Sequence, residues 1–527
     1  MGADEVHGRF GMRAFLQTAL LLLALTTLAS GQEPFEGQTL IAPMNATYTE
    51  LIDLDGTVLH TWHGASRPAS MAYLLDDGSV LRPCVDPGGY FSGGGTGGRI
   101  QRIDPDDQVV WDYFFSTDDY QQHHDVEPLP NGNVLVVAWE HKSREEALGA
   151  GRQQVFGEMW PTLIVEIEPL GASGGTIVWA WHAWDHLIQD VDPQKPNYGV
   201  VSEHPERFDI NYGQIPPETG DWLHINAIDY DPIRDQIVFS SRPFGEIYVI
   251  DHSTTTEEAA GHQGGNCGMG GDILYRWGNP QTYDRGLPDD QYFFAPHGVN
   301  WIDAGMPGSR NLLIFNNGDR PGGADDYTTV DELVTPQNPD GTYEIAPGEP
   351  FGPSAPTWTY GGPETYGGPT QCGAYRLPNG NTLITYCEPG HIFEVSETGA
   401  TVWEHNLPGQ TRVARAPRYW EDTSSAPASA DHRCVPDLDL QIVSGHPLVD
   451  RIAFRVRTAN GPSASLAVHD LLGRRVRTLR LECSAPGEAR AVWNGRDSSG
   501  RDVPAGAYFT LLHSGRVTKT MRLCVVR

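Results

Sequence analysis

Three histidines share one position in a repeated sequence pattern. His124, His224 and His297 each stand four or five residues before an apolar residue that begins or enters a predicted strand. Because equivalent positions in successive repeats point the same way, we expect the three imidazoles to converge on one site. Imidazole titrates near neutral pH, so these side chains can act as general acid, general base or nucleophile. A lone histidine would more often be structural, but the shared position favours a chemical role.

The polar residues near these histidines indicate the kind of group that they would handle. Asn226 follows the second histidine by two residues, and Asn300 follows the third by three. Arg242 stands at the end of the strand after the second histidine. An arginine fork together with amide donors suits a tetrahedral oxyanion such as sulfate. A neutral imidazole would then supply the nucleophile.

Zinc is the alternative that three histidines also raise. Histidines on separate repeats can bind metal, but the sequence contains no His-x-His pair. The nearest carboxylates in the sequence, Asp125 and Asp229, follow their histidines at different offsets. This difference disfavours one shared metal site, so we assign no metal ligands to the histidines. A metal-assisted hydrolase or lyase remains an open alternative.

Two recurring sequence units predict the elements that position these side chains. In the first unit, an Asp/Asn-Gly turn joins two apolar strands, as in residues 73–81, 129–135 and 377–383. In the second, a polar turn precedes a strand that carries tryptophan, and its copies contain Trp62, Trp111, the pair Trp179 and Trp181, Trp277, Trp358 and Trp403. Hairpins joined in series are typical of a β-propeller with four-stranded blades. The expected fold class is therefore all-β, with a six-bladed propeller.

Segments without alternating apolar residues predict loops. The longest of them cover residues 141–160, 184–222, 252–270 and 319–355. We expect these insertions to gather on one face, where loops carry function. A glycine-rich run at residues 93–98 lacks the lysine of a phosphate-binding loop, so we expect a flexible loop there.

The composition changes after the propeller repeats. Residues 422–436 are rich in Thr, Ser, Ala and Pro, which predicts a linker between a propeller at 32–421 and a module at 437–527. Short alternating strands with glycine turns favour an immunoglobulin-like β-sandwich for this module. The stretches 493–497 and 503–508 resemble the immunoglobulin-like module of flagellar hook-capping proteins. We expect the module to serve attachment, for example to the cell surface, or spacing.

The N-terminal segment predicts export. Arg9 and Arg13 precede a mainly apolar run, and Ala29-Ser30-Gly31 forms a small-residue cleavage site, so residues 1–31 are expected to be a signal peptide. Met12 could equally be the start. No later run is apolar for the ~20 residues that a membrane helix needs. The mature protein is expected to be periplasmic, extracellular or at the cell surface, with no membrane span.

The charge of the chain restricts its partners. The formal net charge is -32, which opposes binding to nucleic acid or to an anionic membrane. An anionic substrate would therefore need a local positive patch. The seven cysteines are too few for a disulfide scaffold. If Asn379-Gly380 is a two-residue hairpin turn, Cys372 opposes Cys387, and either a disulfide or two separate buried thiols would follow.

The segment from residue 38 to 420 resembles the periplasmic, cofactor-independent aryl-sulfate sulfotransferases. Four features carry the resemblance, and the eighteen-residue interval between His224 and Arg242 is the most specific of them. The others are His123-His124-Asp125 before a Leu-Pro-Asn-Gly-Asn turn, the run Leu-His-Ile-Asn at 223–226, and the run Pro-His-Gly-Val-Asn at 296–300.

The resemblance implies a reaction and roles for these residues. It implies a six-bladed propeller that passes a sulfuryl group from a phenolic sulfate donor to a phenol acceptor through a sulfated histidine, with no cofactor and no PAPS. His297 would be the nucleophile, and His224 with the pair His123 and His124 would supply acid, base and sulfate-binding groups. Asn226 and Arg242 would hold the sulfate.

A different class of function stays open on the residues alone. A propeller can serve as a non-catalytic surface protein that binds a glycan or a protein through its loop face. Such a protein would tolerate replacement of His297 without loss of binding, whereas the enzyme would not.

Overall fold

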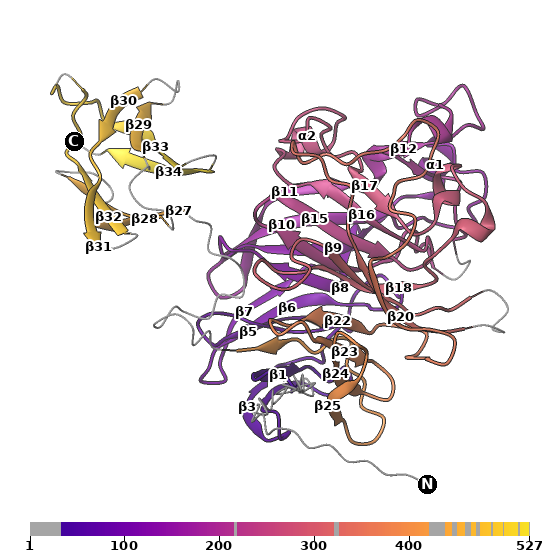
Figure 1. The fold of residues 1–527 in the computed structure, drawn as a ribbon. Helices are drawn as coiled ribbons and strands as arrows, with labels where there is room; N and C mark the ends of the chain where they lie inside the picture. Colours follow the sequence, from indigo (N-terminus) through magenta and orange to yellow (C-terminus); the bar gives the residue numbers. More distant parts are fainter. Residues whose placement is uncertain are drawn as a thin grey trace, which may run out of the picture.

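The computed structural model describes residues 33–215, 219–320 and 326–420. In the C-terminal part it describes residues 438–444, 451–458, 465–470, 475–485, 488–498, 500–514 and 517–525. The predicted signal peptide at 1–31 and the predicted linker at 422–436 lie outside the described residues. Nearly all elements are strands (Figure 1), so the predicted all-β class, with a propeller followed by an immunoglobulin-like sandwich, is confirmed. In the described part, no helix has the length and apolar character to cross a membrane.

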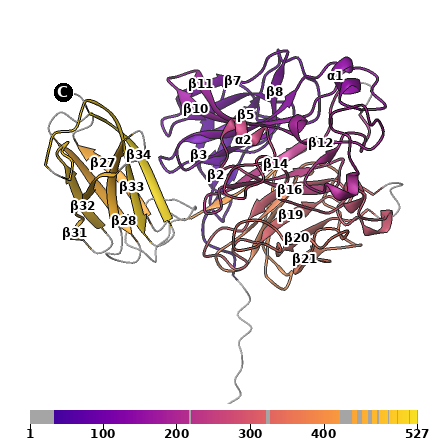
Figure 2. The same ribbon diagram turned by 90° about the horizontal axis from the view of Figure 1, so that it is seen from above.

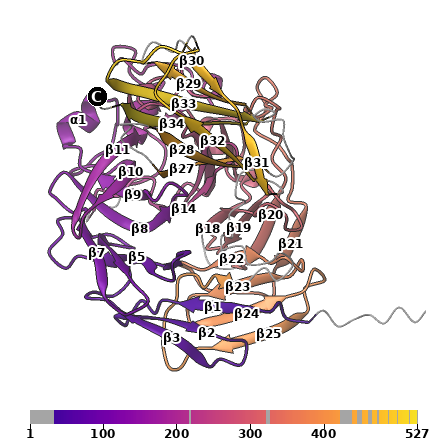
Figure 3. The ribbon, with the colours of Figure 1, turned by 90° about the vertical axis from the view of Figure 1, so that its left-hand side faces the viewer.

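Six four-stranded antiparallel sheets follow one another around a ring between residues 38 and 419 (Figure 3). The first contains β1 (Gln38–Ile41), β2 (Tyr48–Ile52), β3 (Val58–His63) and β26 (Arg418–Tyr419). The second contains β4 (Tyr73–Leu74), β5 (Val80–Val85), β6 (Gly98–Ile103) and β7 (Val109–Phe114). The third contains β8 (Tyr120–Pro128), β9 (Val134–Glu140), β10 (Thr162–Leu170) and β11 (Gly174–His182). Since β26 pairs with β1, strands from both ends of this segment share a sheet and close the ring.

The other half of the ring has the same order of strands. The fourth sheet contains β14 (Ile225–Asp231), β15 (Gln236–Ser241), β16 (Glu246–Asp251) and β17 (Tyr275–Trp277). The fifth contains β18 (Pro296–Trp301), β19 (Leu312–Asn316), β20 (Thr329–Leu333) and β21 (Trp358–Gly361). The sixth contains β22 (Gly373–Arg376), β23 (Thr382–Tyr386), β24 (His391–Val395) and β25 (Thr401–Asn406). The first strand of each of these three sheets, like β8, faces the centre of the ring (Figure 3).

The insertions contain short elements. These are α1 (Arg144–Gly149), α2 (Thr256–Ala259), the 3₁₀ turns η1 (Ala183–His186), η2 (Val201–Glu203), η3 (Pro280–Tyr283) and η4 (Pro288–Asp290), and the parallel pair β12 (Leu187–Ile188) and β13 (Phe208–Asp209). Both α-helices begin with a capping box, at Ser143 and at Thr255, which satisfies amide groups that the first turn leaves without partners.

Tryptophans recur on the outermost strands, and those of the second to sixth sheets tie each of these sheets to the next. Trp111 on β7 donates from Nε1 to the Gly174 carbonyl at 2.8 Å. Trp403 on β25 donates to the Leu54 carbonyl at 2.7 Å, which joins the last sheet to the first. Trp179, Trp277 and Trp358 make the corresponding bonds to Thr254, Pro353 and Glu397. The repeated indole N–H therefore explains why tryptophan recurs in the sequence.

The innermost strands β8, β14 and β18 are irregular close to the three histidines. Their pairing registers shift between Gln122 and Val126, between Ile225 and Ala227, and between His297 and Asn300. His124 and His224 have positive φ values of 52° and 44° at these points, a conformation that costs a non-glycine residue about 1–2 kcal/mol. Bulges of this kind turn side chains out of the ladder, and here they place the three shared-position histidines at the same end of the inner strands.

The hairpin between β22 and β23 corrects one expectation. Gly380 N donates to Leu377 O at 2.9 Å, so the predicted turn exists. The strands nevertheless pair Arg376 with Thr382, because five residues rather than two separate them. This register places Cys387 one position beyond the residue that would oppose Cys372. Both are buried free thiols, and Cys387 N lies 3.2 Å from Cys372 Sγ.

The C-terminal module consists of two four-stranded sheets (Figure 2). One contains β27 (Leu438–Ser444), β28 (Ile452–Thr458), β32 (Glu488–Trp493) and β31 (Glu482–Ala485). The other contains β30 (Arg475–Leu479), β29 (Ser465–Asp470), β33 (Gly506–Ser514) and β34 (Val517–Val525). Side chains from both sheets, including Phe454, Val468 and Trp493, form one buried core. Packing of two sheets around such a core is the predicted sandwich.

Candidate active site

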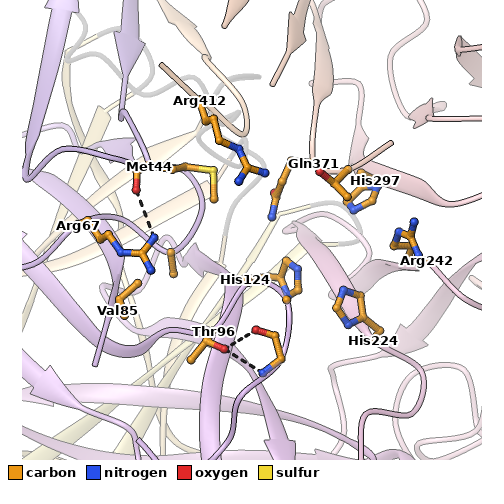
Figure 4. A pocket seen from close by; sticks show the side chains of 15 residues that line it. Met44, Arg67, Val85, Thr96, His124, His224, Arg242, His297, Gln371 and Arg412 are labelled. Atoms are coloured by element: carbon orange, nitrogen blue, oxygen red, sulfur yellow. Dashed lines mark hydrogen bonds between the residues drawn. The ribbon is translucent and has the colours of Figure 1, made fainter. Parts of the chain in front are cut away.

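A cavity of about 480 Å³ lies beside the inner strands β8, β14 and β18. His124, His224 and His297 all line it, as Figure 4 shows. Arg242, from the turn between β15 and β16, lines the same cavity next to His297 and His224 (Figure 4). The expected convergence of these four side chains is therefore what the structure shows.

The ring of His297 is fixed in one tautomer by its partners. Its Nδ1 lies 2.7 Å from Asn317 Oδ1 and 3.0 Å from Ala295 O. Asn317 Nδ2 already donates to the carbonyls of Gly368 and Gln371, so its Oδ1 is the atom that faces the imidazole. Both neighbours of Nδ1 are acceptors, and His297 must therefore carry its proton there. The lone pair of the neutral ring is then on Nε2.

Burial keeps His297 neutral. Only 3% of the residue is exposed. Burial, with Arg242 and His224 nearby, lowers the pKa of His297 from 6.5 to about 3, because both desolvation and neighbouring positive charge disfavour the imidazolium. At neutral pH the ring is therefore an unprotonated nitrogen base beside an arginine.

His224 is oriented by a carboxylate. Its Nδ1 is hydrogen-bonded to Asp221 Oδ2, and Asp221 Oδ1 accepts a bond of 2.8 Å from Trp139 Nε1. Burial tends to raise the pKa of Asp221, but His224 and the hydrogen bonds outweigh it and lower the pKa below its usual value. A charged carboxylate on Nδ1 leaves Nε2 of His224 as the atom for proton exchange in the cavity.

The structure distinguishes the two adjacent histidines. His124 lines the cavity, and its ring packs edge-on against His224 with centroids 4.7 Å apart. His123 lies behind it and stacks on Trp139, with ring centroids 4.2 Å apart. The Nδ1 atoms of His123 and His124 are 2.8 Å apart. Burial lowers the pKa of His123 to about 3 and that of His124 well below 6.5. Of the pair, His124 is the one available to a substrate.

The glycine-rich run forms a wall of the cavity. Gly93, Gly94, Gly95 and Thr96 line it, and the Gly95 carbonyl accepts a bond of 2.6 Å from His124 N. A Cβ atom on Gly95 would lie 2.2 Å from His124 Nε2. The sequence predicted only a flexible loop here, whereas the close approach of this backbone to the imidazole explains why glycine is needed.

Three arginines give the cavity a positive patch. Arg242 pairs with Asp319 at 2.8 Å, and Arg412 pairs with Glu388 at 2.7 Å. Arg67 donates to the Met44 carbonyl at 3.4 Å and lies with Arg412 on the side away from Arg242 (Figure 4). The local positive patch that an acidic chain would need for an anionic substrate is present.

Asn226 and Asn300 lie elsewhere than expected. Asn226 Nδ2 donates to Pro296 O at 2.8 Å, and its Oδ1 accepts from Ser240 Oγ at 2.6 Å. Asn300 Nδ2 donates to Ala374 O at 2.8 Å. Neither side chain belongs to the described residues that line the cavity. Each instead joins its inner strand to the next one around the ring.

A buried ion pair supports the site next to His124. Asp125 binds Arg415, and it also accepts hydrogen bonds from the Tyr73 hydroxyl at 3.0 Å and from Ile228 N at 3.2 Å. Burial tends to lower the pKa of Arg415, but Asp125 together with Tyr375 and Tyr73 outweighs burial and raises it. The resulting fixed positive charge contributes to the low pKa of His124. Breaking such a buried pair costs about 3–5 kcal/mol.

Several of these residues, including Asp221, Asn317, Arg412 and Arg415, were not predicted from the sequence. Asp221 had a usable signal, since it stands three residues before His224 in the same loop. Asn317, Arg412 and Arg415 had none, because sequence separations of 20 residues or more divide them from the groups that they contact. Only closure of the ring brings Arg412 and Arg415 to the site.

A ring of β-sheets thus holds a neutral histidine, a carboxylate-bound histidine and arginines in one cavity, an arrangement that suits transfer of an anionic group. The family model "Arylsulfotransferase (ASST)" matches residues 85–335, which include all of these histidines and Arg242. This match confirms the predicted resemblance of the propeller segment to the arylsulfotransferase family, and it indicates a PAPS-independent sulfotransferase. The model "FlgD Ig-like domain" matches residues 450–511 in the C-terminal module.

Other comparisons add only distant likenesses. None of the curated proteins matches the chain. A structure of a protein of unknown function from Bacteroides caccae is 10% identical, covers 72% of this chain and 98% of its own, and has a TM-score of 0.39. Regucalcin from Agrobacterium tumefaciens, described as calcium-binding, is 10% identical, covers 67% of this chain and 86% of its own, and has a TM-score of 0.30. The Ig1 domain of mouse SynCAM 2 is 13% identical, covers 17% of this chain and 91% of its own, and has a TM-score of 0.12.

Proposed function

We propose that this arylsulfotransferase moves a sulfuryl group from a phenolic sulfate ester to a phenol in two steps, with His297 Nε2 as the nucleophile. The observation that carries the proposal is the tautomer of His297. Two acceptors hold its proton on Nδ1, and burial keeps the ring unprotonated on Nε2 at neutral pH. Such a ring is a nucleophile without any prior proton transfer.

In the first step the donor loses its phenol. Nε2 of His297 attacks the sulfur atom in line with the aryl oxygen, and the S–O bond to the phenol breaks as the S–N bond forms. The phenolate takes a proton from Nε2 of His224, whose imidazolium form the Asp221 carboxylate stabilises. The Nδ1 proton of His297 stays in place, held by Asn317 and Ala295, and balances charge on the sulfated ring.

The second step reverses these roles with another phenol. Neutral His224 accepts the proton of the acceptor phenol, and the phenol oxygen attacks the sulfur of the sulfohistidine. His297 then returns to its starting state. A positioned acid and base each contribute about 10²–10⁴-fold, and one histidine that alternates between the two forms serves both steps.

The arginines bind the sulfate group in this scheme. Arg242 pairs with Asp319 at a half-exposed position, so an arriving sulfate competes with that carboxylate for the guanidinium. A bidentate arginine suits sulfate geometry. His124 supplies a further neutral imidazole for one hydrogen bond in the cavity. Asn226 and Asn300 keep the inner strands in register and so position the histidines.

We also propose that the enzyme works outside the cytoplasm. The basic and apolar residues of segment 1–31 support export, and residues 437–527 would form a module that attaches or spaces the propeller at 32–421. Detection of the mature N-terminus after secretion from a bacterial host tests this. A protein that keeps residues 1–31 and stays in the cytoplasm would contradict it.

Transfer of the sulfuryl group from 4-nitrophenyl sulfate to a second phenol tests the proposed reaction. We expect nitrophenol release that rises with acceptor concentration, sulfated acceptor as the product, and parallel lines in double-reciprocal plots. Nitrophenol release without sulfated acceptor would contradict transfer. If folded protein released no nitrophenol from several aryl sulfates, the binding propeller would become the better account.

A further inference from the structure

A second group of histidines lies outside the cavity. His186 ends η1, which follows β11 of the third sheet, whereas His262 and Asp272 lie between α2 and β17 of the fourth sheet. We call these three residues the interblade cluster, because they connect segments from neighbouring sheets. Their ligand atoms lie within 4.8 Å of one another, and this is the one group of its kind in the part of the chain that the structure describes.

The cluster places three potential ligands around one point. His186 Nδ1 and His262 Nδ1 each lie 2.8 Å from the same oxygen, Asp272 Oδ1. The His186 side chain is fully buried and that of Asp272 is 6% exposed. The His262 side chain is 45% exposed, so one side of the cluster is open to water.

The hydrogen bonds of His186 make its Nδ1 suitable for a cation. His186 Nε2 lies 2.8 Å from the carbonyl of Ala259, which is an acceptor, so this nitrogen carries a proton. A neutral imidazole has one N–H only, and its bare Nδ1 then faces the Asp272 carboxylate oxygen. In a neutral ring this contact would set two electron pairs against each other, so a positive charge must lie between the two atoms, either a second proton on the ring or a bound cation.

The surroundings hold the ring in that orientation. His186 stacks on Trp181 with centroids 5.7 Å apart and an interplanar angle of 7°. Trp181 Nε1 donates to the Gly271 carbonyl at 2.7 Å, next to Asp272 in the chain. An imidazole that ligates a metal usually donates its other N–H to a backbone carbonyl or a carboxylate, and the bond to Ala259 is of that type.

We propose that the interblade cluster binds Zn²⁺ through His186 Nδ1, His262 Nδ1 and Asp272. Two imidazole nitrogens and one carboxylate are a ligand set that suits zinc, whereas Ca²⁺ and Mg²⁺ prefer oxygen alone. Water on the exposed side beside His262 completes a tetrahedron. The ion fastens the insertion at 252–272 to η1 and so stabilises the contact between the third and fourth sheets.

Metal content of the full chain tests the proposal. Protein stripped with a chelator is loaded with a stoichiometric amount of Zn²⁺, freed of unbound ion and assayed by mass spectrometry for zinc. We expect one retained Zn²⁺ per chain and a melting temperature that rises on loading. Cobalt in place of zinc should give the visible absorption bands of a tetrahedral site.

Variants assign the ion to these residues. His262→Ala removes a ligand at the surface, and Asp272→Asn replaces the carboxylate by an amide of the same shape. Since loss of an outer partner alone typically costs 10–100-fold in metal affinity, each variant should lose at least that much. His391→Ala removes a histidine that pairs with Glu404 on the sixth sheet and should retain the ion.

Two results would overturn the proposal. One is loaded wild-type protein that keeps no zinc, which would make the cluster an ion pair between Asp272 and protonated histidines. The other is equal zinc retention by wild type, His262→Ala and Asp272→Asn, which would place the ion elsewhere. Neither readout depends on sulfotransferase activity.

Discussion

The cavity and the interblade cluster both gather histidines, but they use the imidazole ring differently. In the cavity, His297 ties Nδ1 to Asn317 and His224 ties Nδ1 to Asp221, while both rings line open space. In the interblade cluster, nitrogens of His186 and His262 converge on one carboxylate oxygen. The surroundings of the ring nitrogens therefore decide the chemistry. A nitrogen that faces the cavity can react, whereas nitrogens of two rings that face one carboxylate oxygen can hold a cation.

The local backbone explains this difference. The cavity histidines stand at bulges where inner strands begin, and His124 and His224 keep positive φ values there. His186 and His262 lie in insertions outside the inner strands. Conformational strain of about 1–3 kcal/mol per residue is typical of functional sites. Two of the three cavity histidines, His124 and His224, thus stand at strained positions, whereas the described non-glycine residues with positive φ do not include His297.

The largest expected effect comes from removing the nucleophile. His297→Asn keeps a donor for Asn317 but lacks Nε2, so sulfotransfer should fall by at least about 10⁴-fold in kcat/KM. His391→Ala should keep wild-type activity, since His391 lies on β24 and pairs with Glu404. If His297→Asn were nearly as active as wild type, His297 could not be the nucleophile, and the cavity histidines would have no catalytic role to set them apart from the interblade cluster.

A smaller loss is expected when the carboxylate on His224 is neutralised. Asp221→Asn retains the shape but not the charge that stabilises the imidazolium, so kcat should fall by about 10²–10³-fold. The loss should be greatest for donors whose phenols are poor leaving groups, because those need the proton most. Rates measured over a series of substituted phenyl sulfates check this. An equal loss for every donor would contradict an acid role for His224.

Substitution of glycine tests the cavity wall. Gly95→Ala places a methyl group against His124, and the displaced ring should reduce kcat by roughly 10–10²-fold. Gly132→Ala is the matched control, because Gly95 and Gly132 have φ values of 68° and 88°, but a Cβ on Gly132 meets nothing within 4 Å. Both variants carry a similar backbone strain. Similar activities in the two variants would show that strain, and not the contact with His124, matters.

The smallest effect concerns stability at low pH. Burial lowers the pKa of His123 to about 3, whereas the unfolded chain binds this proton near pH 6.5. The unfolded state therefore binds more protons between pH 6.5 and 3, and stability falls as pH decreases through that window. His123→Phe keeps the stacking on Trp139 and should reduce this slope by up to about 1.4 kcal/mol per pH unit.

Urea unfolding of wild type and His123→Phe at about pH 5 and about pH 7 measures that difference. His252 has the opposite sign: its neighbours Asp235 and Glu166 outweigh burial and raise its pKa to about 9, so its contribution is complete below pH 6.5 and disappears as pH rises through 9. Because His252 is present in both wild type and His123→Phe, the difference between their slopes reports His123 alone. Equal slopes in wild type and variant would contradict a buried neutral His123.

The sequence predicted the parts of the site that the repeat itself determines. Because β8, β14 and β18 each shift register close to a histidine, the shared position of His124, His224 and His297 was enough to predict that they converge. The tryptophans on the outer strands follow the same repeat. The all-β fold and the strands of the C-terminal module were predictable for the same reason, since both depend on local patterns of period two.

The remaining features depend on contacts between distant segments. Asn226 and Asn300 were predicted at the substrate, but the next inner strand offers backbone carbonyls that they bind instead. Asn317 and Arg415 are brought to the site by neighbouring sheets and by ring closure, which no sequence spacing reveals. The register at Cys372 and Cys387 differed by one position because the turn has five residues, and a shift of one residue exchanges the faces of a strand.

The most direct test of the account is to look for the sulfated enzyme itself. Wild-type protein mixed with 4-nitrophenyl sulfate and no acceptor, then quenched, should show an intact mass increased by one sulfuryl group, and peptide mapping should place that group on His297. Addition of a phenol should remove it and yield the aryl sulfate. An active enzyme that never carries the group, or carries it equally in His297→Asn, would contradict the two-step mechanism through His297.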